Sequence, residues 1–341
     1  MPAAASDAPR EPIVDLSVAM PPGPDVVEHA KLAADLGYRR IWLYDSAALY
    51  DDIWIWLSRI AEHADIDFGT AVLVPNLRHV MTTAAAITTI EGLAPGRLAC
   101  GFGTGATARF ILNKRGLSWA TTRRYLEQLR ALLRGEVVEI DGERCQMIHH
   151  PRWSKARPID TPLLLSALGP KGTETTLDMH GHGVVDGLIT MADVDVDIPW
   201  RIHMTAGTVL DPGESVTDPR VVGALGPWYV VMYHGAWQMY PDAVPHMPAG
   251  AEWLAGIDAE RPEGERHLAV HEGHVTDVMA RDRVLIDAAG EALANTGWVG
   301  SRDDIAGRVA QAEAAGTTEI MYTPAGDMAR EMRTFAEAVL G

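Results

Sequence analysis

Short apolar runs alternate along the chain with longer segments in which polar and apolar positions are mixed. The runs lie at residues 13–20, 40–44, 70–74, 97–100, 163–167, 184–190, 202–210 and 319–323. Those at 70–74 and 97–100 are too continuous to have one wet face, so we expect strands buried on both sides. Helices are predicted at residues 25–36, 51–63, 78–93, 118–134, 169–180, 301–316 and 328–339. This alternation predicts an α/β fold with a parallel sheet.

The two ends of the chain carry similar helix-glycine-strand units. Residues 312–323 repeat the pattern of residues 33–44, with Gly316 in the place of Gly37. Similar units at both ends suit a barrel whose first and last strands are neighbours. With eight strand candidates, we therefore predict one (β/α)₈ TIM-barrel domain spanning residues 1–341.

Three further segments interrupt or precede this alternation. Asp141-Gly142 is a turn dipeptide that predicts a hairpin over residues 137–147. Residues 218–274 are apolar but broken by Gly and Pro, and we expect this extra mass, after strand seven, to cap the mouth of the barrel. The alanine-rich residues 1–11 predict a loose tail.

The charge and composition restrict the possible partners. The formal net charge of −17 argues against binding to nucleic acid or to an anionic membrane surface. No run approaches the roughly 18 apolar residues of a membrane helix. Two cysteines do not make a disulfide framework, and we find no secretory signal pattern. We expect a soluble, cytoplasmic protein that acts on a small molecule.

In a TIM barrel the site forms just after the strands, at their carboxyl ends. The segments to inspect are therefore Asp45-Ser46 and residues 74–76, 101–106, 166–172 and 323–326. Several of these residues are small, which lets a flat ring or a phosphate approach the backbone. Within them, residues 169–172 (Gly-Pro-Lys-Gly) lie between a strand and a helix, where unpaired amides favour a phosphate. The alternative interpretation of residues 169–172 is an ordinary turn between a strand and a helix.

A glycine-rich segment at residues 101–106 also matches the dinucleotide pattern G-x-G-x-x-A. That pattern requires a helix directly after it and an acidic residue at the end of the next strand, about 20 residues on. Residues 107–116 show no amphipathic helix, and residue 121 lies inside a predicted helix. The dinucleotide-binding interpretation is therefore weak.

Two histidine pairs were considered as metal ligands. His271 and His274 are three positions apart with glycine between them, which differs from the zinc-peptidase spacing. His180 and His182 follow a helix and not the first strand. We therefore expect no metal, and we keep His271 as a candidate proton donor or substrate contact.

The densest basic group is formed by Arg109, Lys114, Arg115, Arg123 and Arg124. One interpretation is a solvated surface. The other is attraction of an anionic cofactor tail.

Residues 69–105 carry a resemblance to a known family. The segments are Asn76-Leu77-Arg78-His79, Thr82 to Ala86, Leu93 to Arg97 and Gly101 to Gly105. Together they resemble the bacterial luciferase-like superfamily of flavin- and deazaflavin-dependent oxidoreductases. The similarity is greatest to the branch that uses coenzyme F420 and contains methylene-tetrahydromethanopterin reductase. It covers most of residues 12–187 and returns over residues 298–335.

The resemblance implies hydride transfer through coenzyme F420, with FMN-dependent monooxygenation as the alternative. It also implies a homodimer and a non-proline cis peptide near Leu73-Val74. A metal-dependent barrel hydrolase and a non-catalytic cofactor-binding barrel are rivals from other classes. The implied cofactor contacts are Asp45, Leu73, Val74, Asn76, Gly103, Thr104, Gly105, Arg109, Ser166, Gly169, Pro170, Lys171 and Gly172.

Asp45 and Ser46 are the candidate catalytic residues, together with His271. Many relatives carry histidine where this chain has Ser46, and some carry glutamate where it has Ala106. These departures argue against a sugar-phosphate dehydrogenase mechanism that uses a His/Glu acid-base pair.

Overall fold

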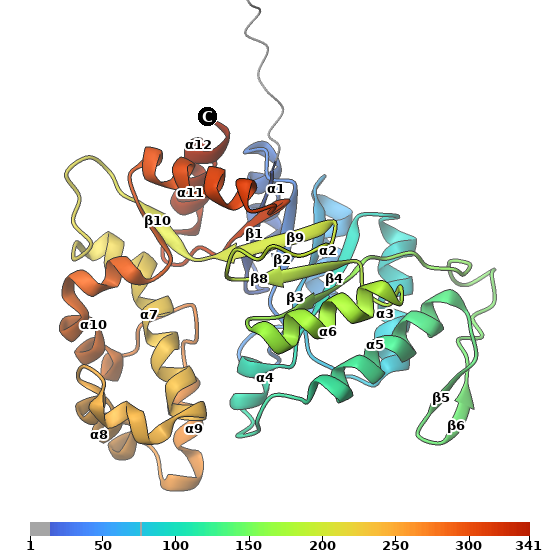
Figure 1. Cartoon of the computed structure of the whole chain (residues 1–341), viewed down its shortest axis with the longest axis horizontal. Coiled ribbons are helices and arrows are strands. Elements are labelled where there is room, and N and C mark those ends of the chain that lie inside the picture. The colour runs from blue at the N-terminus through green and yellow to red at the C-terminus, as the bar shows by residue number, and fades with distance from the viewer. Residues whose placement is uncertain (1–13, 76) are drawn as a thin grey trace, which may run out of the picture.

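The structure is a computed structural model that describes residues 14–75 and 77–341. Eight parallel strands close into a barrel in the order β1-β12-β9-β8-β7-β4-β3-β2. Figure 1 shows barrel strands with helices packed around them. The strands are β1 (Asp15–Met20), β2 (Arg40–Leu43), β3 (Asp67–Leu73), β4 (Leu98–Phe102), β7 (Leu163–Ser166), β8 (Gly187–Thr190), β9 (Trp200–Thr205) and β12 (Glu319–Tyr322). The predicted (β/α)₈ TIM barrel is confirmed. The expected tail at residues 1–11 lies outside the described residues.

The barrel strands are apolar on both faces because both faces are covered. Trp42 fills the barrel interior, whereas its neighbours Ile41 and Leu43 pack into the layer between strands and helices. Gly69 makes room for Trp42, since a Cβ at Gly69 would lie 2.4 Å from the indole ring. Continuous apolar runs follow from this double burial.

Helices α1 (Val26–Asp35), α2 (Ile53–His63), α3 (Val80–Leu93), α5 (Trp119–Arg134), α6 (Pro170–Gly181), α11 (Arg302–Ala314) and α12 (Met328–Leu340) alternate with the strands. A capping box begins α11, because Ser301 accepts from the amide of Asp304 and the Asp304 carboxylate accepts from the amide of Ser301. Gly37 and Gly316 both adopt positive φ, of 86° and 89°, directly after their helices. The repeated units at the two ends therefore fold alike, and β1 pairs with β12 to close the barrel.

Two elements differ from the sequence-based expectation. The strand expected at residues 202–210 is split into β9 and β10 (Gly207–Val209), and β10 pairs outside the barrel with β11 (Trp298–Gly300). Gly207 has φ of 143°, and a Cβ there would lie 1.9 Å from the carbonyl oxygen of Trp298. The second difference is a five-residue helix, α4 (Ala106–Phe110), where an irregular segment was expected. A helix of five residues is too short to show the 3.6-residue periodicity by which helices are recognised in a sequence.

The predicted hairpin and the insertion after strand seven are both present. Strands β5 (Val138–Ile140) and β6 (Glu143–Cys145) pair across Asp141-Gly142. The insertion contains α7 (Pro219–Met239), α8 (Gly250–Glu260), α9 (Arg266–His271) and α10 (Arg283–Ala289), with short 3₁₀ turns η1 (Pro241–His246), η2 (Glu263–Glu265), η3 (Ala280–Asp282) and η4 (Gly290–Asn295). It forms a separate group of helices beside the barrel (Figure 1) and has its own apolar core around Tyr233 and Trp253. The single-domain organisation remains a prediction.

Two smaller points complete the fold. The non-proline cis peptide expected near Leu73-Val74 lies two residues earlier, between Ala71 and Val72. In the described part of the chain, none of the helices combines the length and apolar character needed to span a membrane.

Candidate functional site at the mouth of the barrel

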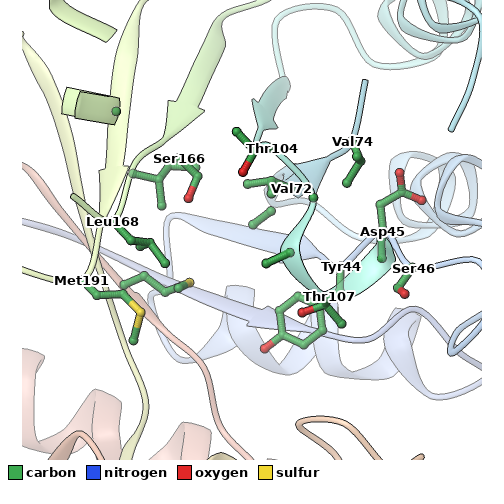
Figure 2. Close-up of a pocket in the computed structure, with 18 of the residues that line it drawn as sticks. Tyr44, Asp45, Ser46, Val72, Val74, Thr104, Thr107, Ser166, Leu168 and Met191 are labelled. Carbon is green, nitrogen blue, oxygen red and sulfur yellow. The ribbon is translucent and has the colours of Figure 1, made fainter. Parts of the chain in front are cut away.

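A cavity of about 610 Å³ lies at the carboxyl ends of the barrel strands. Ligand sites usually measure about 300 to 1,000 Å³, so this volume suits a cofactor or substrate. Its wall is formed by the ends of β2, β3, β4, β7, β8 and β9 and by side chains of the insertion. Figure 2 shows Asp45 and Ser46 on one side of the cavity and Ser166, Leu168 and Met191 on the other.

Most of the predicted site residues line this cavity, because parallel strands bring their carboxyl ends to one edge. Those that line it are Asp45, Ser46, Val74, Gly103, Thr104, Gly105, Ser166, Gly169, Pro170, Lys171 and Gly172. Asn76 lies outside the described residues.

Three predicted site residues do not line the cavity. Leu73 is buried in the layer between strands and helices, because alternate residues of β3 face opposite sides and Val72 and Val74 face the cavity. Arg109 donates from Nε to the carbonyl of Arg115. His271 is fully buried behind the wall, and the cavity is reached by His274 instead.

The glycine loop after β4 presents the backbone of Gly103 and Gly105 to the cavity, with the side chain of Thr104 between them. A Cβ at Gly103 would lie 2.9 Å from Cγ2 of Val72, and one at Gly105 would lie 2.4 Å from Cγ1 of Val74. Gly105 also has φ of 80°, which strains any other residue. The loop therefore packs tightly against β3 and leaves a smooth surface on which a flat ring fits.

The start of α6 forms another part of the wall. Gly169 precedes the helix with extended backbone, Pro170 takes the first turn, and no side chain caps this end. A Cβ at Gly172 would lie 2.6 Å from the ring of Trp119, so the first turn packs closely against a neighbouring helix. Uncapped amides and the exposed cation of Lys171 make this end suitable for a phosphate.

Asp45 is buried and paired with a cation. Its Oδ2 lies 2.6 Å from Nη1 of Arg78, and its side chain is 2% exposed. Burial raises the pKa of Asp45, while the hydrogen bond and charge of Arg78 and the backbone amide of Val74 act in the opposite direction. Arg78 belongs to the segment that carries the family resemblance, but it was not among the predicted site residues. Its place just after strand three, at the carboxyl end of the barrel, was the sequence feature that could have identified Arg78 as a site residue.

Two polar groups in the wall have no partner among the described residues. They are the hydroxyl of Ser46 and the indole nitrogen of Trp228, which comes from α7 of the insertion. Buried polar groups are usually hydrogen-bonded. Both are therefore candidate contacts to a ligand.

His274 closes the cavity from the side of the insertion. Its Nε2 lies 2.9 Å from the hydroxyl of Thr107, and its carbonyl accepts from the hydroxyl of Tyr50 at 2.7 Å. Burial lowers the pKa of His274 to about 3, so the imidazole is neutral at pH 7. Sequence reasoning treated His274 only as part of a histidine pair.

The basic group is only partly free. Arg123 forms an ion pair with Asp178, whereas Lys114, Arg115 and Arg124 are exposed and, among the described residues, have no ion pair. The segment that follows Arg115 packs on the glycine loop, since the amide of Leu117 donates to the carbonyl of Thr104 at 2.8 Å. Lys114 and Arg115 therefore lie on a segment anchored at the edge of the cavity.

The family model described as luciferase-like monooxygenase matches residues 7–195, which is more than half of the chain. The chain belongs to the luciferase-like monooxygenase family. This luciferase-like chain is 28% identical over 180 residues to the F420-dependent glucose-6-phosphate dehydrogenase of Beutenbergia cavernae, which covers 43% of this chain and 52% of that protein. The chain spans about half the length of the curated relatives it matches.

Solved structures show the same fold over nearly the whole luciferase-like chain. The coenzyme F420-dependent tetrahydromethanopterin reductase of Methanopyrus kandleri superimposes with a TM-score of 0.64 at 17% identity, covering 96% of this chain and 98% of that one. A type II Baeyer-Villiger monooxygenase of Pseudomonas putida, in complex with FMN, superimposes with a TM-score of 0.61 at 12% identity, with coverages of 96% and 98%. One fold thus serves both cofactors among these proteins.

Proposed function

We propose that this chain is an oxidoreductase that uses coenzyme F420 to transfer hydride to or from a small organic substrate. The observation that carries the proposal is the cavity itself. It joins a glycine loop in which Gly103 and Gly105 expose backbone, the uncapped start of α6 and, at its edge, a segment whose Lys114 and Arg115 have no ion pair among the described residues. These features match a flat ring, a phosphate and an anionic tail.

Coenzyme F420, when bound, supplies the ring that accepts or gives up the hydride. The glycine loop and Val72 would hold the ring, and residues 169–172 would hold the phosphate. Lys114 and Arg115 would attract the carboxylates of the tail. The tail needs such partners because the chain as a whole carries a net charge of −17.

Asp45, Ser46 and His274 are the polar side chains proposed to position the reacting groups. Arg78 and the amide of Val74 hold the Asp45 carboxylate in one orientation. The Ser46 hydroxyl has no protein partner among the described residues and is therefore available to a ligand. Because Ser46 and Ala106 replace a His/Glu pair, a general acid-base mechanism on a sugar phosphate is not part of the proposal.

The remaining wall suits an apolar substrate. Leu168, Met191, Trp228 and Val231 line the cavity and contribute mostly apolar surface. Leu168 is 66% exposed and Met191 is 48% exposed, so both offer that surface to a ligand. By family resemblance, the proposal also includes a cytoplasmic homodimer.

FMN-dependent monooxygenation is the second candidate. The start of α6 would accept the single phosphate of FMN equally well, and one structural neighbour contains FMN. The two cofactors differ in the tail, because FMN lacks the glutamates of coenzyme F420. The cations at the edge of the cavity therefore favour coenzyme F420.

The test is a titration of purified apo-protein with coenzyme F420 and with FMN, at low and high salt. We expect tighter binding of coenzyme F420 that weakens as salt rises. Exposed ion pairs contribute only about 0.2 to 1 kcal/mol each, so Lys114→Ala combined with Arg115→Ala should weaken binding several-fold and reduce the salt dependence. Arg144→Ala, on the distant hairpin strand β6, is the matched control and should leave binding unchanged. Tighter binding of FMN, or equal effects of the two sets of substitutions, would overturn the assignment.

A further inference from the structure

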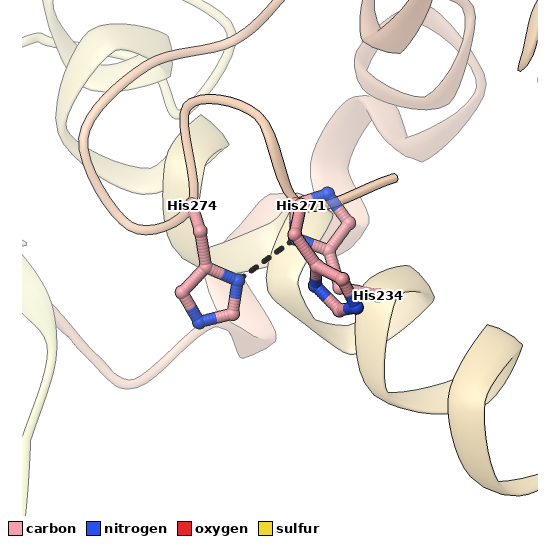
Figure 3. Close-up of side chains that lie close together, drawn as sticks. All are labelled: His234, His271 and His274. Carbon is pink, nitrogen blue, oxygen red and sulfur yellow. Dashed lines mark hydrogen bonds between the residues drawn. The ribbon is translucent and has the colours of Figure 1, made fainter. Parts of the chain in front are cut away.

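Three buried histidines meet in the insertion (Figure 3). His274 is part of the cavity wall, and the other two lie behind it. His234 lies in α7, His271 is the last residue of α9, and His274 lies in the turn that follows. One ring nitrogen of each lies within 4.8 Å of the others. Their exposed fractions are 2%, 0% and 7%. The three rings therefore converge on one point that is shielded from solvent.

Hydrogen bonds among the described residues leave three of the six ring nitrogens without a partner. Nδ1 of His234 lies 2.9 Å from Nδ1 of His274, and Nε2 of His274 bonds to Thr107. Both ring nitrogens of His271, and Nε2 of His234, have no partner in the described part of the chain. A neutral imidazole carries one donor and one acceptor, and leaving such groups buried without partners is destabilising. A packing role alone would favour apolar side chains here.

A metal ion accounts for this arrangement. Imidazole is a common ligand of zinc, and a neutral ring offers a lone pair. Two nitrogens bound to one tetrahedral zinc lie about 3.3 Å apart, so nitrogens within 4.8 Å of one another would draw closer around the ion.

The contact to Thr107 supports the same interpretation. When Nδ1 of a histidine binds a metal, its Nε2–H needs an acceptor that fixes the ring. The Thr107 hydroxyl, 2.9 Å from Nε2 of His274, supplies that acceptor. Thr107 and His274 both line the cavity, whereas His234 and His271 do not.

We propose that His234, His271 and His274 bind a divalent transition-metal ion of the zinc class, with water at the fourth position. The ion ties α7 to α9 and to the following turn, and it fixes His274 against Thr107 at the mouth of the cavity. This site does not depend on which cofactor the barrel binds. The sequence showed only the pair at 271 and 274, because His234 lies far away along the chain.

The test measures metal in the full chain, produced without a histidine tag so that a tag cannot bind the ion. We expect about one equivalent of metal per chain by elemental analysis, removable by a chelator. Returning Zn²⁺ to the stripped protein should raise the melting temperature by several degrees, since an ion that binds only the folded state stabilises it. Replacing it with Co²⁺ should give the visible absorption of a four-coordinate nitrogen-ligated site.

Matched substitutions decide between this site and adventitious binding. His234→Gln and His271→Gln should each lower the affinity for Zn²⁺ at least tenfold, whereas His182→Gln, on an exposed histidine, should not change it. Thr107→Val should lower the affinity about 10 to 100-fold, and Thr107→Ser should retain it. Failure of the wild-type chain to bind Zn²⁺ or Co²⁺, or equal binding by His182→Gln and the two cluster variants, would overturn the proposal. If a cluster variant does not fold, the Co²⁺ spectrum of the wild type and the two Thr107 variants still decide.

Discussion

Nη1 of Arg78 lies 2.6 Å from Oδ2 of Asp45, in the wall of the cavity. The second terminal nitrogen of Arg78 reaches Asp52 at 3.3 Å, and Asp52 itself caps the start of α2. One guanidinium thus joins the segment after β3 to the end of β2 and to the next helix. The ion pair orients the Asp45 carboxylate in the wall of the cavity.

Removing this cation should leave a buried carboxylate without its partner. We expect Arg78→Met to lower the free energy of unfolding by about 3 kcal/mol at pH 7. Because the folded-state pKa of Asp45 would rise further, the carboxyl would bind a proton more readily in the folded chain than in the unfolded chain. The loss should therefore shrink as pH falls from 7 towards 5.

The measurement is denaturant unfolding of a double-mutant cycle with Asp45→Asn. The double variant should recover part of the stability lost in Arg78→Met, since it no longer buries an unpaired charge. Additive effects of the two substitutions, or a loss that does not change with pH, would contradict this prediction.

Two glycines at the start of α6 should respond differently to alanine. Gly172→Ala places a Cβ 2.6 Å from the ring of Trp119 and 2.8 Å from Cβ of Ala167, so the helix start must shift. We expect a loss of about 1 to 3 kcal/mol in stability and weaker binding of the cofactor phosphate. Gly169→Ala meets nothing within 4 Å, and its φ of −162° is extended backbone, so its stability should be unchanged. Thermal unfolding measures the stability of the two variants, and cofactor titration measures their binding. Equal melting temperatures for the two variants would contradict this prediction.

Ser46→Ala separates a ligand contact from a structural one. Its hydroxyl has no partner among the described residues, so its removal should leave the free energy of unfolding unchanged or slightly higher. If the hydroxyl contacts cofactor or substrate, binding or turnover should fall by about fivefold, the effect of one hydrogen bond of about 1 kcal/mol. Unfolding and cofactor-titration experiments on the same preparation give both values. A clear loss of stability without a change in binding or turnover would show that the hydroxyl has a structural role.

The ion pair between Glu214 and Arg220, where α7 begins, should make the free energy of unfolding depend on pH in the acidic range. The hydrogen bond from Arg220 lowers the pKa of Glu214 to about 2. A lowered folded-state pKa stabilises the folded chain above the ordinary pKa of glutamate, and this contribution is lost as pH falls towards 2. Allowing for solvent screening, we expect Glu214→Gln to cost about 1 kcal/mol at pH 7 and progressively less below pH 4.5. Urea unfolding from pH 7 to below pH 4.5 measures this cost, and Glu139→Gln, at an exposed position, is the control. A cost that stays constant with pH would exclude the ion pair as its cause.

Patterns within a few residues identified most strands and helices of the barrel, because the signals for these elements lie within the elements themselves. Each of the eight barrel strands overlaps a continuous apolar run, since a strand buried on both faces has no polar side to interrupt it. The capping box at Ser301 and the hairpin at Asp141-Gly142 depend on residues only a few positions apart. The ends of the strands then located Asp45, Ser46, Gly103 and residues 169–172 at one edge, since a closed parallel barrel brings them there.

Other features depended on contacts between residues far apart in the sequence. The break between β9 and β10 follows from the close approach of Gly207 to Trp298, and no local signal marks that approach. Leu73 was misplaced by one residue, and in a strand that reverses the face on which the side chain lies.

The amino-acid sequence by itself determined the barrel and the edge where its site lies, because strand burial, helix capping and turn geometry act over a few residues. Only the tertiary structure decided which side chains meet across that edge. Arg78 reaches Asp45 across the gap between two strand ends, His274 reaches Thr107 from the insertion, and His234 joins His271 from another helix. These contacts arise from the packing of whole elements, and the spacing of residues along the chain does not predict them.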